Sequence, residues 1–330
     1  MIITRTPFRM SFFGGGTDFS GFYNEHGGAV LSTTFDKYCY VTVRHLPRFF
    51  DYKTHLTYSK EEKVNSYAEI NHPAIRNAME WLDMHEIRLV YDSDLPARTG
   101  LGTSSSFAVG MLEAFYALKG KYADKRKLAD DAIHLERVLC AEAGGIQDQI
   151  AASFGGLNRI NFSADGYAVN PVIISPERKK ALNDNLMLFF TGISRFSSDV
   201  QKKTEKSMKD KTQELLKMYE LVDKAEQVLV QKNSDLDDFG RLLDYTWQLK
   251  RGISSGISSD SIDEQYNAAI KAGALGGKLL GAGGGGFLLF YVPKEKQDAV
   301  RAALKNQLHV PFQFENEGTK IVFYQAEDFE

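Results

Sequence analysis

Residues 95 to 106 read Leu-Pro-Ala-Arg-Thr-Gly-Leu-Gly-Thr-Ser-Ser-Ser, and this turn leads directly into a helix pattern. Glycine has no side chain, so the backbone N–H groups around it can approach an anion closely. The N-terminus of the following helix would add unpaired N–H donors and the positive end of its dipole. The segment therefore indicates a cradle for nucleotide phosphates, although a glycine turn that merely opens a helix has the same local pattern.

Two common phosphate loops do not fit the chain. A Rossmann fingerprint needs a glycine where Ser105 stands. A Walker A loop needs Ser or Thr directly after its lysine, but Lys278, which follows two glycines, precedes Leu279. A phosphate loop of another type is expected.

Size and composition restrict the class of protein. At 330 residues the chain exceeds the usual size of one hydrophobic core, so we expect two domains. A formal net charge of −3 gives no reason to expect nucleic-acid binding. Cys39 and Cys140 do not make a disulfide framework, and no apolar run approaches the roughly 18 residues of a membrane span. We therefore expect a cytoplasmic protein without a membrane segment.

Hydrophobic periodicity predicts a mixture of helices and strands. The predicted strands cover residues 1–13, 30–43, 88–91, 186–190 and 320–324. The predicted helices cover residues 72–85, 104–118, 125–142, 201–232 and 261–272. We expect turns over residues 161–176 and a glycine run, residues 281–286, that leads into an apolar strand.

Two acidic residues lie in patterns that suit a catalytic cleft. Glu136 has Ala132 and Leu139 as its neighbours on one helix face, and an inward carboxylate needs a partner such as a metal ion. Asp148 follows a glycine turn, which suits either a carboxylate aimed into a cleft or an ordinary helix cap.

Two other glycine segments allow both a functional and a structural interpretation. Residues 14–16 are three glycines between a strand and Asp18, whose carboxylate could accept hydrogen bonds from sugar hydroxyls or cap a turn. Residues 281–286 could approach a ligand, or they could form a tight turn or a close helix–strand contact.

Taken together, these segments resemble the three motifs of the GHMP small-molecule kinases, in the family's order. Residues 5–28, with Pro7-Phe8-Arg9 and then Thr17-Asp18-Phe19, are similar to the first motif. Residues 95–106 are similar to the second motif and residues 278–286 to the third. The resemblance implies an α+β, two-lobed fold with an N-terminal domain over residues 1–180 and a ferredoxin-like C-terminal domain over residues 181–330.

Four segments are most similar to the D-glycero-D-manno-heptose 7-phosphate kinase branch of this family. They are residues 13–18, 27–34, 36–38 and 191–195. That branch transfers the ATP γ-phosphoryl to the anomeric hydroxyl of the sugar phosphate, and its product feeds GDP-heptose synthesis for surface polysaccharide. Many family members carry Glu-His where this chain has only glycines, so a role for those side chains cannot be carried over.

The resemblance also implies site residues. Asp148 would accept or orient the sugar hydroxyl proton, Arg9 would stabilise charge on the transferred phosphoryl group, and Ser104 and Glu136 would bind Mg²⁺. The implied ATP-binding residues are Pro96, Arg98, Gly100, Leu101, Gly102, Thr103, Ser104, Ser105 and Ser106. The implied sugar-binding residues are Gly15, Gly16, Thr17, Asp18, Lys37, Arg195, Gly283 and Gly284.

Other functions share part of this pattern. L-fucose kinases are the first alternative, and a non-catalytic sugar or nucleotide sensor on the same scaffold is the second. A decarboxylase of phosphorylated isoprenoid acids is disfavoured by the sugar-like first motif. The expected partner is a small sugar phosphate, and the chain is expected to be a monomer or a homodimer.

Overall fold

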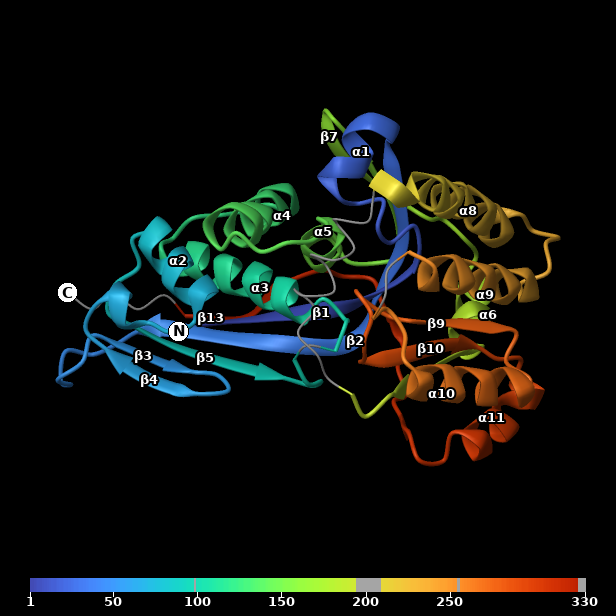
Figure 1. Cartoon of the computed structure of the whole chain (residues 1–330). Helices are drawn as coiled ribbons and strands as arrows, with labels where there is room; N and C mark the ends of the chain where they lie inside the picture. Colours follow the sequence, from blue (N-terminus) through green and yellow to red (C-terminus); the bar gives the residue numbers. More distant parts are fainter. Residues whose placement is uncertain (98, 194–208, 254–255, 326–330) are drawn as a thin grey trace.

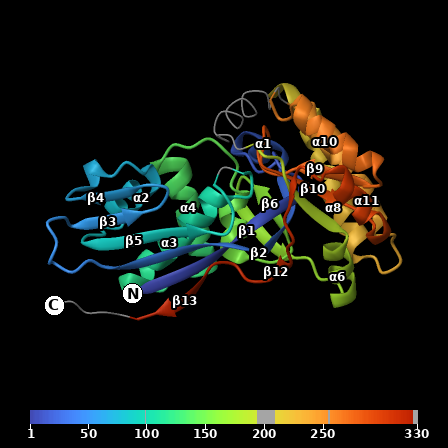
Figure 2. The same ribbon diagram turned by 90° about the horizontal axis from the view of Figure 1, so that it is seen from below.

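The computed structural model describes residues 1–97, 99–193, 209–253 and 256–325. The chain forms two lobes, each built on its own β-sheet and covered by helices (Figures 1 and 2). The expected α+β, two-lobed architecture is confirmed. Among the described residues, no helix has both the length and the apolar character needed to cross a bilayer.

The first lobe is organised around a nine-stranded sheet whose main path runs β13-β1-β2-β5-β3-β4. Its centre is the long antiparallel pair of β1 and β2, in which Ile2 lies opposite Val43 and Phe13 lies opposite Leu31. Strands β6 and β12 pair with β2, and β7 pairs with β6. The strands of this sheet are β1 (Ile2–Phe13), β2 (Gly28–His45), β3 (Thr54–Thr57), β4 (Glu61–Val64), β5 (Ile87–Ser93), β6 (Asn158–Ser163), β7 (Gly166–Pro171), β12 (Phe314–Glu315) and β13 (Lys320–Tyr324).

Helix α3 is the central helix of this lobe and contacts both β1 and β2. It is apolar on nearly every face, and thirteen of its sixteen residues are buried, as expected for a helix enclosed between a sheet and other helices. The helical segments of the lobe are α1 (Ser20–His26), η1 (Tyr67–Glu69), α2 (Pro73–Trp81), α3 (Thr103–Leu118), α4 (Lys125–Ile133), the π-helical turn η2 (His134–Leu139) and α5 (Gln147–Phe154).

The second lobe contains a four-stranded antiparallel sheet in the order β11-β8-β10-β9. Residues of β10 alternate between two cores: Leu289 packs in the cluster that contains Phe239 of α9, and Leu288 packs in the one that contains Tyr266 of α10. Both faces of this strand are thus covered, which explains its continuous apolar sequence. The elements are α6 (Pro176–Asp184), β8 (Leu186–Phe190), η3 (Lys209–Lys211), α8 (Thr212–Val230), α9 (Asp237–Arg251), α10 (Asp260–Lys271), β9 (Gly276–Leu279), β10 (Phe287–Tyr291), η4 (Lys294–Lys296), α11 (Gln297–Ala303) and β11 (Leu308–His309).

Most predicted elements are present, and the differences have local causes. The prediction of turns over residues 161–176 is wrong, because β6 and β7 form a hairpin across Ser163 and Gly166. The segment is rich in Asn, Ser and Asp, which favour turns. Alternate residues of its first strand, such as Ile160 and Phe162, are nevertheless buried, as in a strand that packs against a core. Helix α2 ends at Trp81 instead of residue 85, and the expected 125–142 helix changes to a π-helical turn at His134. Part of the predicted 201–232 helix, residues 201–208, lies outside the described residues.

The end of the chain returns to the first lobe. Strand β13 pairs with β1, with Ile3 opposite Phe323, and β12 pairs with β2, with Phe314 opposite Phe35. The division of the chain at residue 180 stays a prediction, but these two strands belong to the sheet of the N-terminal half. The first sheet is therefore completed only after the second lobe has been synthesised.

Candidate active site

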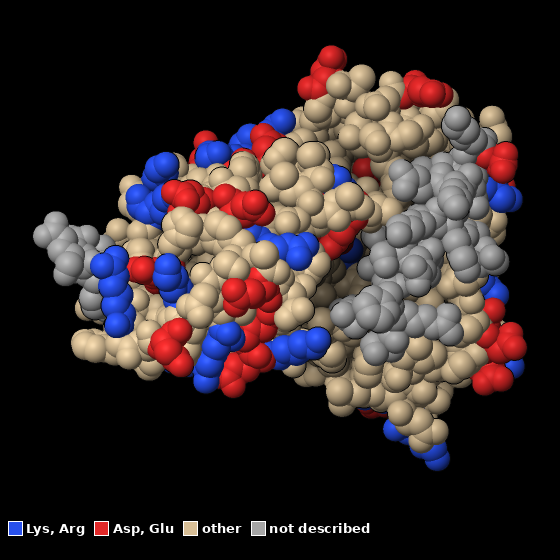
Figure 3. Space-filling view, turned by 60° about the vertical axis from the view of Figure 1, so that its left-hand side comes forward, with Lys and Arg blue, Asp and Glu red and all other residues tan. Residues whose placement is uncertain are grey.

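A pocket of about 700 Å³, part of it open to solvent, lies where the two lobes meet. The face in Figure 3 is hollowed at this junction and carries mixed positive and negative side chains over the first lobe. The pocket is lined by Arg9, Ser11, Gly15, Gly16, Asp18, Phe19, Gly145, Gln147, Asp148, Lys250, Ile253, Ile257, Lys278, Gly281 and Ala282.

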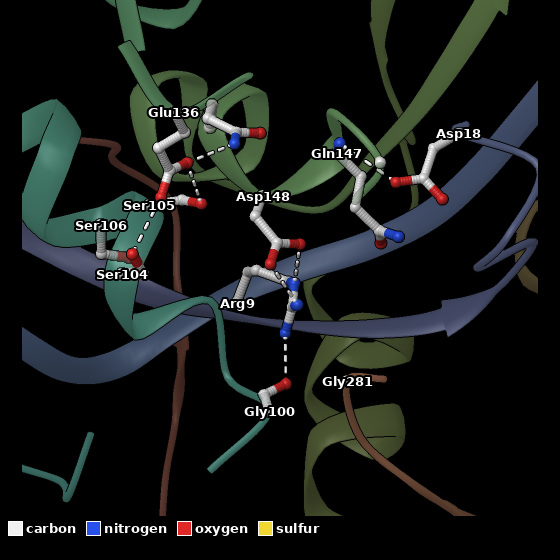
Figure 4. A network of polar contacts seen from close by, with 12 residues as sticks. Arg9, Asp18, Gly100, Ser104, Ser105, Ser106, Glu136, Gln147, Asp148 and Gly281 are labelled. Atoms are coloured by element: carbon white, nitrogen blue, oxygen red, sulfur yellow. Dashed lines mark hydrogen bonds and ion pairs between the residues drawn. The ribbon is translucent and has the colours of Figure 1, made fainter. Parts of the chain in front are cut away.

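Arg9 and Asp148 form a bidentate ion pair at the centre of the site (Figure 4). Arg9 Nε donates to Asp148 Oδ1 at 2.7 Å and Nη2 donates to Oδ2 at 2.6 Å. The third guanidinium nitrogen, Nη1, donates to the carbonyl oxygen of Gly100 at 2.7 Å. Arg9 comes from β1 and Asp148 from the first turn of α5, so packing between these elements holds the carboxylate in place. Such a fork fixes the direction of the carboxylate.

The three glycines after β1 fold Asp18 back towards α5. The backbone N–H of Gly16 donates to Asp18 Oδ1 at 3.0 Å, and that of Gln147 donates to Oδ2 at 3.3 Å. A Cβ atom at Gly145 would lie 1.8 Å from Asp18 Oδ2, so the close approach requires glycine there. Burial, with a smaller contribution from the nearby Asp148 carboxylate, raises the pKa of Asp18, while its hydrogen bonds oppose that rise.

The predicted phosphate loop is the entrance to α3. Gly102 is the N-cap in the left-handed region, with φ of +72°, and the first hydrogen bond of the helix runs from Ser106 N to Gly102 O. The N-terminus of α3 therefore lies beside Asp148, whose Oδ2 would be 3.4 Å from a Cβ at Gly102. Leu101 is buried, and its carbonyl oxygen accepts from the backbone N–H of Arg9 at 3.2 Å.

Glu136 is a buried carboxylate that faces the first turn of α3. Ser104 Oγ donates to Glu136 Oε1 at 2.9 Å and Ser105 Oγ donates to Oε2 at 2.7 Å (Figure 4). Gln149 Nε2 also donates to Oε2, while Gln149 Oε1 is buried and has no hydrogen-bond partner among the residues that the structure describes. A hydroxyl and a carboxylate are hard oxygen donors of the kind that Mg²⁺ prefers, so Ser104 and Glu136 fit the cation.

The structure brings the third predicted motif against the second. A Cβ on Gly281, where φ is +76°, would lie 2.3 Å from the Cα of Gly100. Gly281 and Ala282 line the pocket, whereas the predicted Gly283 and Gly284 do not. Gly284 N instead donates to Ile257 O at 2.9 Å.

Some predicted site residues have structural roles or lie elsewhere. The Thr17 hydroxyl bonds to the carbonyl oxygens of Gly14 and Ala29, and Ser106 Oγ donates to the carbonyl of Pro7. Pro96 accepts a hydrogen bond from the hydroxyl of Thr99.

Lys37 is absent from the pocket lining, and its Nζ donates to both the carbonyl and the carboxylate of Asp36. Arg98 and Arg195 lie outside the described residues.

Sequence reasoning missed several pocket residues, above all Lys250 and Lys278. Lys250 is on the last turn of α9, where basic residues are common on exposed faces, so nothing in the pattern marks it. Lys278 stands in the apolar run that leads from β9 to Leu280, and a lysine in such a run was a usable signal. Ser11 was missed because it lies within the long apolar strand β1.

Family models match both halves of the chain. The model for the GHMP kinases N terminal domain matches residues 66–156, and the model for GHMP kinases C terminal matches residues 222–310. A relative from Campylobacter jejuni is 31% identical over 97% of this chain and 98% of its own length. The chain therefore belongs to the GHMP kinase family.

That Campylobacter relative is a D-glycero-alpha-D-manno-heptose 7-phosphate kinase. An L-fucokinase/L-fucose-1-P guanylyltransferase from Bacteroides fragilis is 32% identical over 63% of this chain but only 22% of its own length. A crystal structure of a D-glycero-D-manno-heptose 1-phosphate kinase from Bacteriodes thetaiotaomicron has a TM-score of 0.80 at 24% identity, covering 99% of this chain and all of the other.

Proposed function

We propose that this chain transfers the γ-phosphoryl group of ATP to the anomeric hydroxyl of D-glycero-D-manno-heptose 7-phosphate. The products would be the 1,7-bisphosphate and ADP. The near full-length similarity to a heptose 7-phosphate kinase supports this choice of substrate. The observation that carries the proposal is the Asp148 carboxylate, held by Arg9 between the N-terminus of α3 and the pocket where the lobes meet.

The phosphates of ATP would lie over the loop from Gly100 to Ser106, where backbone N–H groups and the helix dipole favour negative charge. Ser104 and Glu136 would hold Mg²⁺. The bound cation would neutralise charge on the phosphate oxygens. Gly100 and Gly281 allow the two glycine turns to meet at this point.

In the reaction, Asp148 would accept the proton of the sugar hydroxyl as the oxygen forms its bond to the γ-phosphorus, and the bond to the β,γ-bridging oxygen would break to release ADP. Arg9 was expected to contact the transferred phosphoryl group. Three of its five N–H donors bind Asp148 and Gly100, and one N–H on each of Nη1 and Nη2 is left for phosphoryl oxygens. Arg9 would therefore position the carboxylate and also stabilise charge on the transferred phosphoryl group. Asp18, with the backbone of Gly15 and Gly16, would hold sugar hydroxyls.

An L-fucose kinase activity is the second candidate, because the Bacteroides fragilis relative is 32% identical over 63% of this chain. The substrate test compares kcat/KM for heptose 7-phosphate, unphosphorylated heptose and L-fucose at fixed ATP and Mg²⁺. We expect the two neutral sugars to be at least about a hundredfold worse, since a phosphate dianion gains charge-assisted contacts that they lack. Equal or better activity on L-fucose would reject the heptose assignment and leave the sugar-kinase class standing.

A sensor without catalytic activity is disfavoured by the presence of both Asp148 and Glu136 in hydrogen-bonded positions. The same assay separates this alternative, because a sensor would bind ATP or sugar without forming ADP.

A further inference from the structure

Two lysines in the pocket are buried without an ion-pair partner among the described residues. Lys250 is 8% exposed and Lys278 is 2% exposed. Lys250 Nζ donates to the carbonyl oxygen of Gly281, and Lys278 Nζ donates to that of Phe12 at 2.8 Å. An ammonium group has three N–H donors, so a single carbonyl leaves each lysine able to bind further acceptors.

Burial of unpaired cations is unfavourable, and both groups show its effect. The pKa of Lys250 is lowered to about 8, mainly by loss of solvation and to a smaller extent by repulsion from Arg9. The carboxylates of Asp18 and Asp148 oppose that change. Burial, then repulsion from Lys250 and Arg9, places the pKa of Lys278 well below its usual value. An anion bound beside both ammonium groups would reverse this penalty.

A third donor from another element faces the same pocket. Ser11 on β1 is 6% exposed and lines the pocket, and its hydroxyl has no hydrogen-bond partner within the described part of the chain. It precedes Phe12, whose carbonyl oxygen holds Lys278. Three residues with unused hydrogen-bond donors therefore line one cavity: Ser11 on β1, Lys250 on α9 and Lys278 on β9.

We propose that Lys250, Lys278 and Ser11 form a binding subsite for a phosphoryl anion. The two ammonium groups would contact phosphate oxygens, and the hydroxyl would donate one further hydrogen bond. This inference rests on the proposed function for the source of the anion, which is either the phosphate monoester of the sugar or the γ-phosphoryl group in transfer. Because three of the five N–H donors of Arg9 bind Asp148 and Gly100, either anion would gain from further cations.

The first test measures the subsite without any reaction. Inorganic phosphate is titrated by calorimetry into the wild-type chain and into Lys250→Met, Lys278→Met and Ser11→Ala variants. Lys271→Met removes one exposed lysine from α10 of the same lobe and is the control. We expect Lys250→Met and Lys278→Met each to raise the Kd for phosphate about tenfold to a hundredfold. Ser11→Ala should raise this Kd less, and the Lys271→Met control should bind phosphate like the wild type. Unchanged phosphate affinity in both lysine variants would overturn the proposal.

The second test identifies the anion through the split between kcat and KM. If the subsite holds the sugar phosphate, Lys250→Met and Lys278→Met raise KM for heptose 7-phosphate and leave the neutral heptose unaffected. If it holds the transferred phosphoryl group, kcat falls for both sugars by similar factors. Lys250→Arg, which keeps the charge, is expected to recover part of either loss. Unchanged kcat and KM in both methionine variants would reject the proposal for this enzyme.

The two tests also separate failure of the subsite from failure of the proposed function. A wild-type chain that phosphorylates no heptose phosphate contradicts the function, while the phosphate titration still supports or overturns the subsite. Circular dichroism of each variant verifies folding, and the lysine-to-arginine variants supply the comparison if a methionine variant does not fold.

Discussion

Arg9 and Asp148 make the contact on which the proposed chemistry depends most. Asp148→Asn keeps the shape of the side chain but removes its charge, so it can no longer take a proton from the sugar hydroxyl. We expect kcat to fall by about 10²- to 10⁴-fold, with the Kd of ATP nearly unchanged. Steady-state kinetics and ATP titration measure the two effects. Asp165→Asn, an exposed aspartate in the β6–β7 turn, is the control, and near wild-type turnover of Asp148→Asn would contradict the assignment.

The lowered pKa of Lys250 leads us to expect that the stability of the folded chain depends on pH. Its pKa in the folded chain is about 8, below that of a free lysine, because it is buried and faces Arg9 and Lys278 as well as Asp18 and Asp148. Below pH 8 the folded state must bury a charged ammonium group. Between pH 8 and the unfolded pKa, the unfolded state binds more protons than the folded one, so stability rises with pH there.

Lys250→Met removes this penalty, which we expect to reach about 3 kcal/mol at neutral pH. The free energy of unfolding of Lys250→Met should exceed that of the wild type most near pH 7. The difference should shrink as the pH rises from 8 towards the pKa of lysine in the unfolded chain. Urea unfolding of wild type and variant at pH 7 and pH 9.5 measures it, with Lys271→Met as the control. A gain that is constant with pH would show that Lys250 stays charged in the folded chain.

At the scale of elements, the π-helical turn η2 presents Glu136 to the first turn of α3. If this pair of elements holds Mg²⁺, Ser104→Ala and Glu136→Gln should each raise the apparent dissociation constant for Mg²⁺ by at least about tenfold, because even outer partners of metal ligands contribute that much. Kinetic titration of Mg²⁺ at saturating ATP measures the change.

Glu113→Gln is the matched control for this pair. Glu113 is a carboxylate on the same helix α3, but it accepts a hydrogen bond from Thr319 of the C-terminal segment, away from Ser104 and the first turn of the helix. An unchanged Mg²⁺ requirement in both Ser104→Ala and Glu136→Gln would show that other residues bind the cation.

At the scale of the whole molecule, the two lobes meet where Gly281 touches Gly100. Gly281→Ala places a Cβ 2.3 Å from the Cα of Gly100, so one glycine turn must move away from the other. We expect kcat/KM to fall by at least about tenfold, since a displacement near 1 Å at a reacting site can cost about a hundredfold. Assay of kcat/KM and of Tm measures both activity and folding.

Gly120→Ala is the control for backbone strain. Gly120 also has a positive φ, +66°, but a Cβ there meets nothing within 4 Å. Both variants place alanine at a positive φ, which costs about 1–2 kcal/mol. Only Gly281→Ala also produces a steric clash, with the backbone of Gly100. Equal kcat/KM in the two variants would mean that the contact between the turns is not needed for turnover.

Local patterns in the sequence predicted many of the elements and the identity of several site residues. Alternation and apolar runs indicated β1 and β8, periodicity indicated α3 and α10, and the glycine turns marked Gly100 and Gly281. These signals work because backbone propensity and side-chain period are decided by neighbours in the chain. The β6–β7 hairpin was not predicted. Its strands are short, and their alternation of apolar and polar residues is a weaker signal than their many turn-forming residues.

The sequence by itself thus determined the order of the elements, the family and the candidate acids Asp148 and Glu136. Only the tertiary structure decided which groups meet. Arg9 pairs with Asp148 across 139 positions, which fixes the direction of the carboxylate in the pocket. Lys250 and Lys278 become buried, with no carboxylate partner among the described residues, only when α9 packs against β1 and Lys278 reaches Phe12. Burial and long-range pairing are properties of packing between distant segments, and no local pattern of residues contains them.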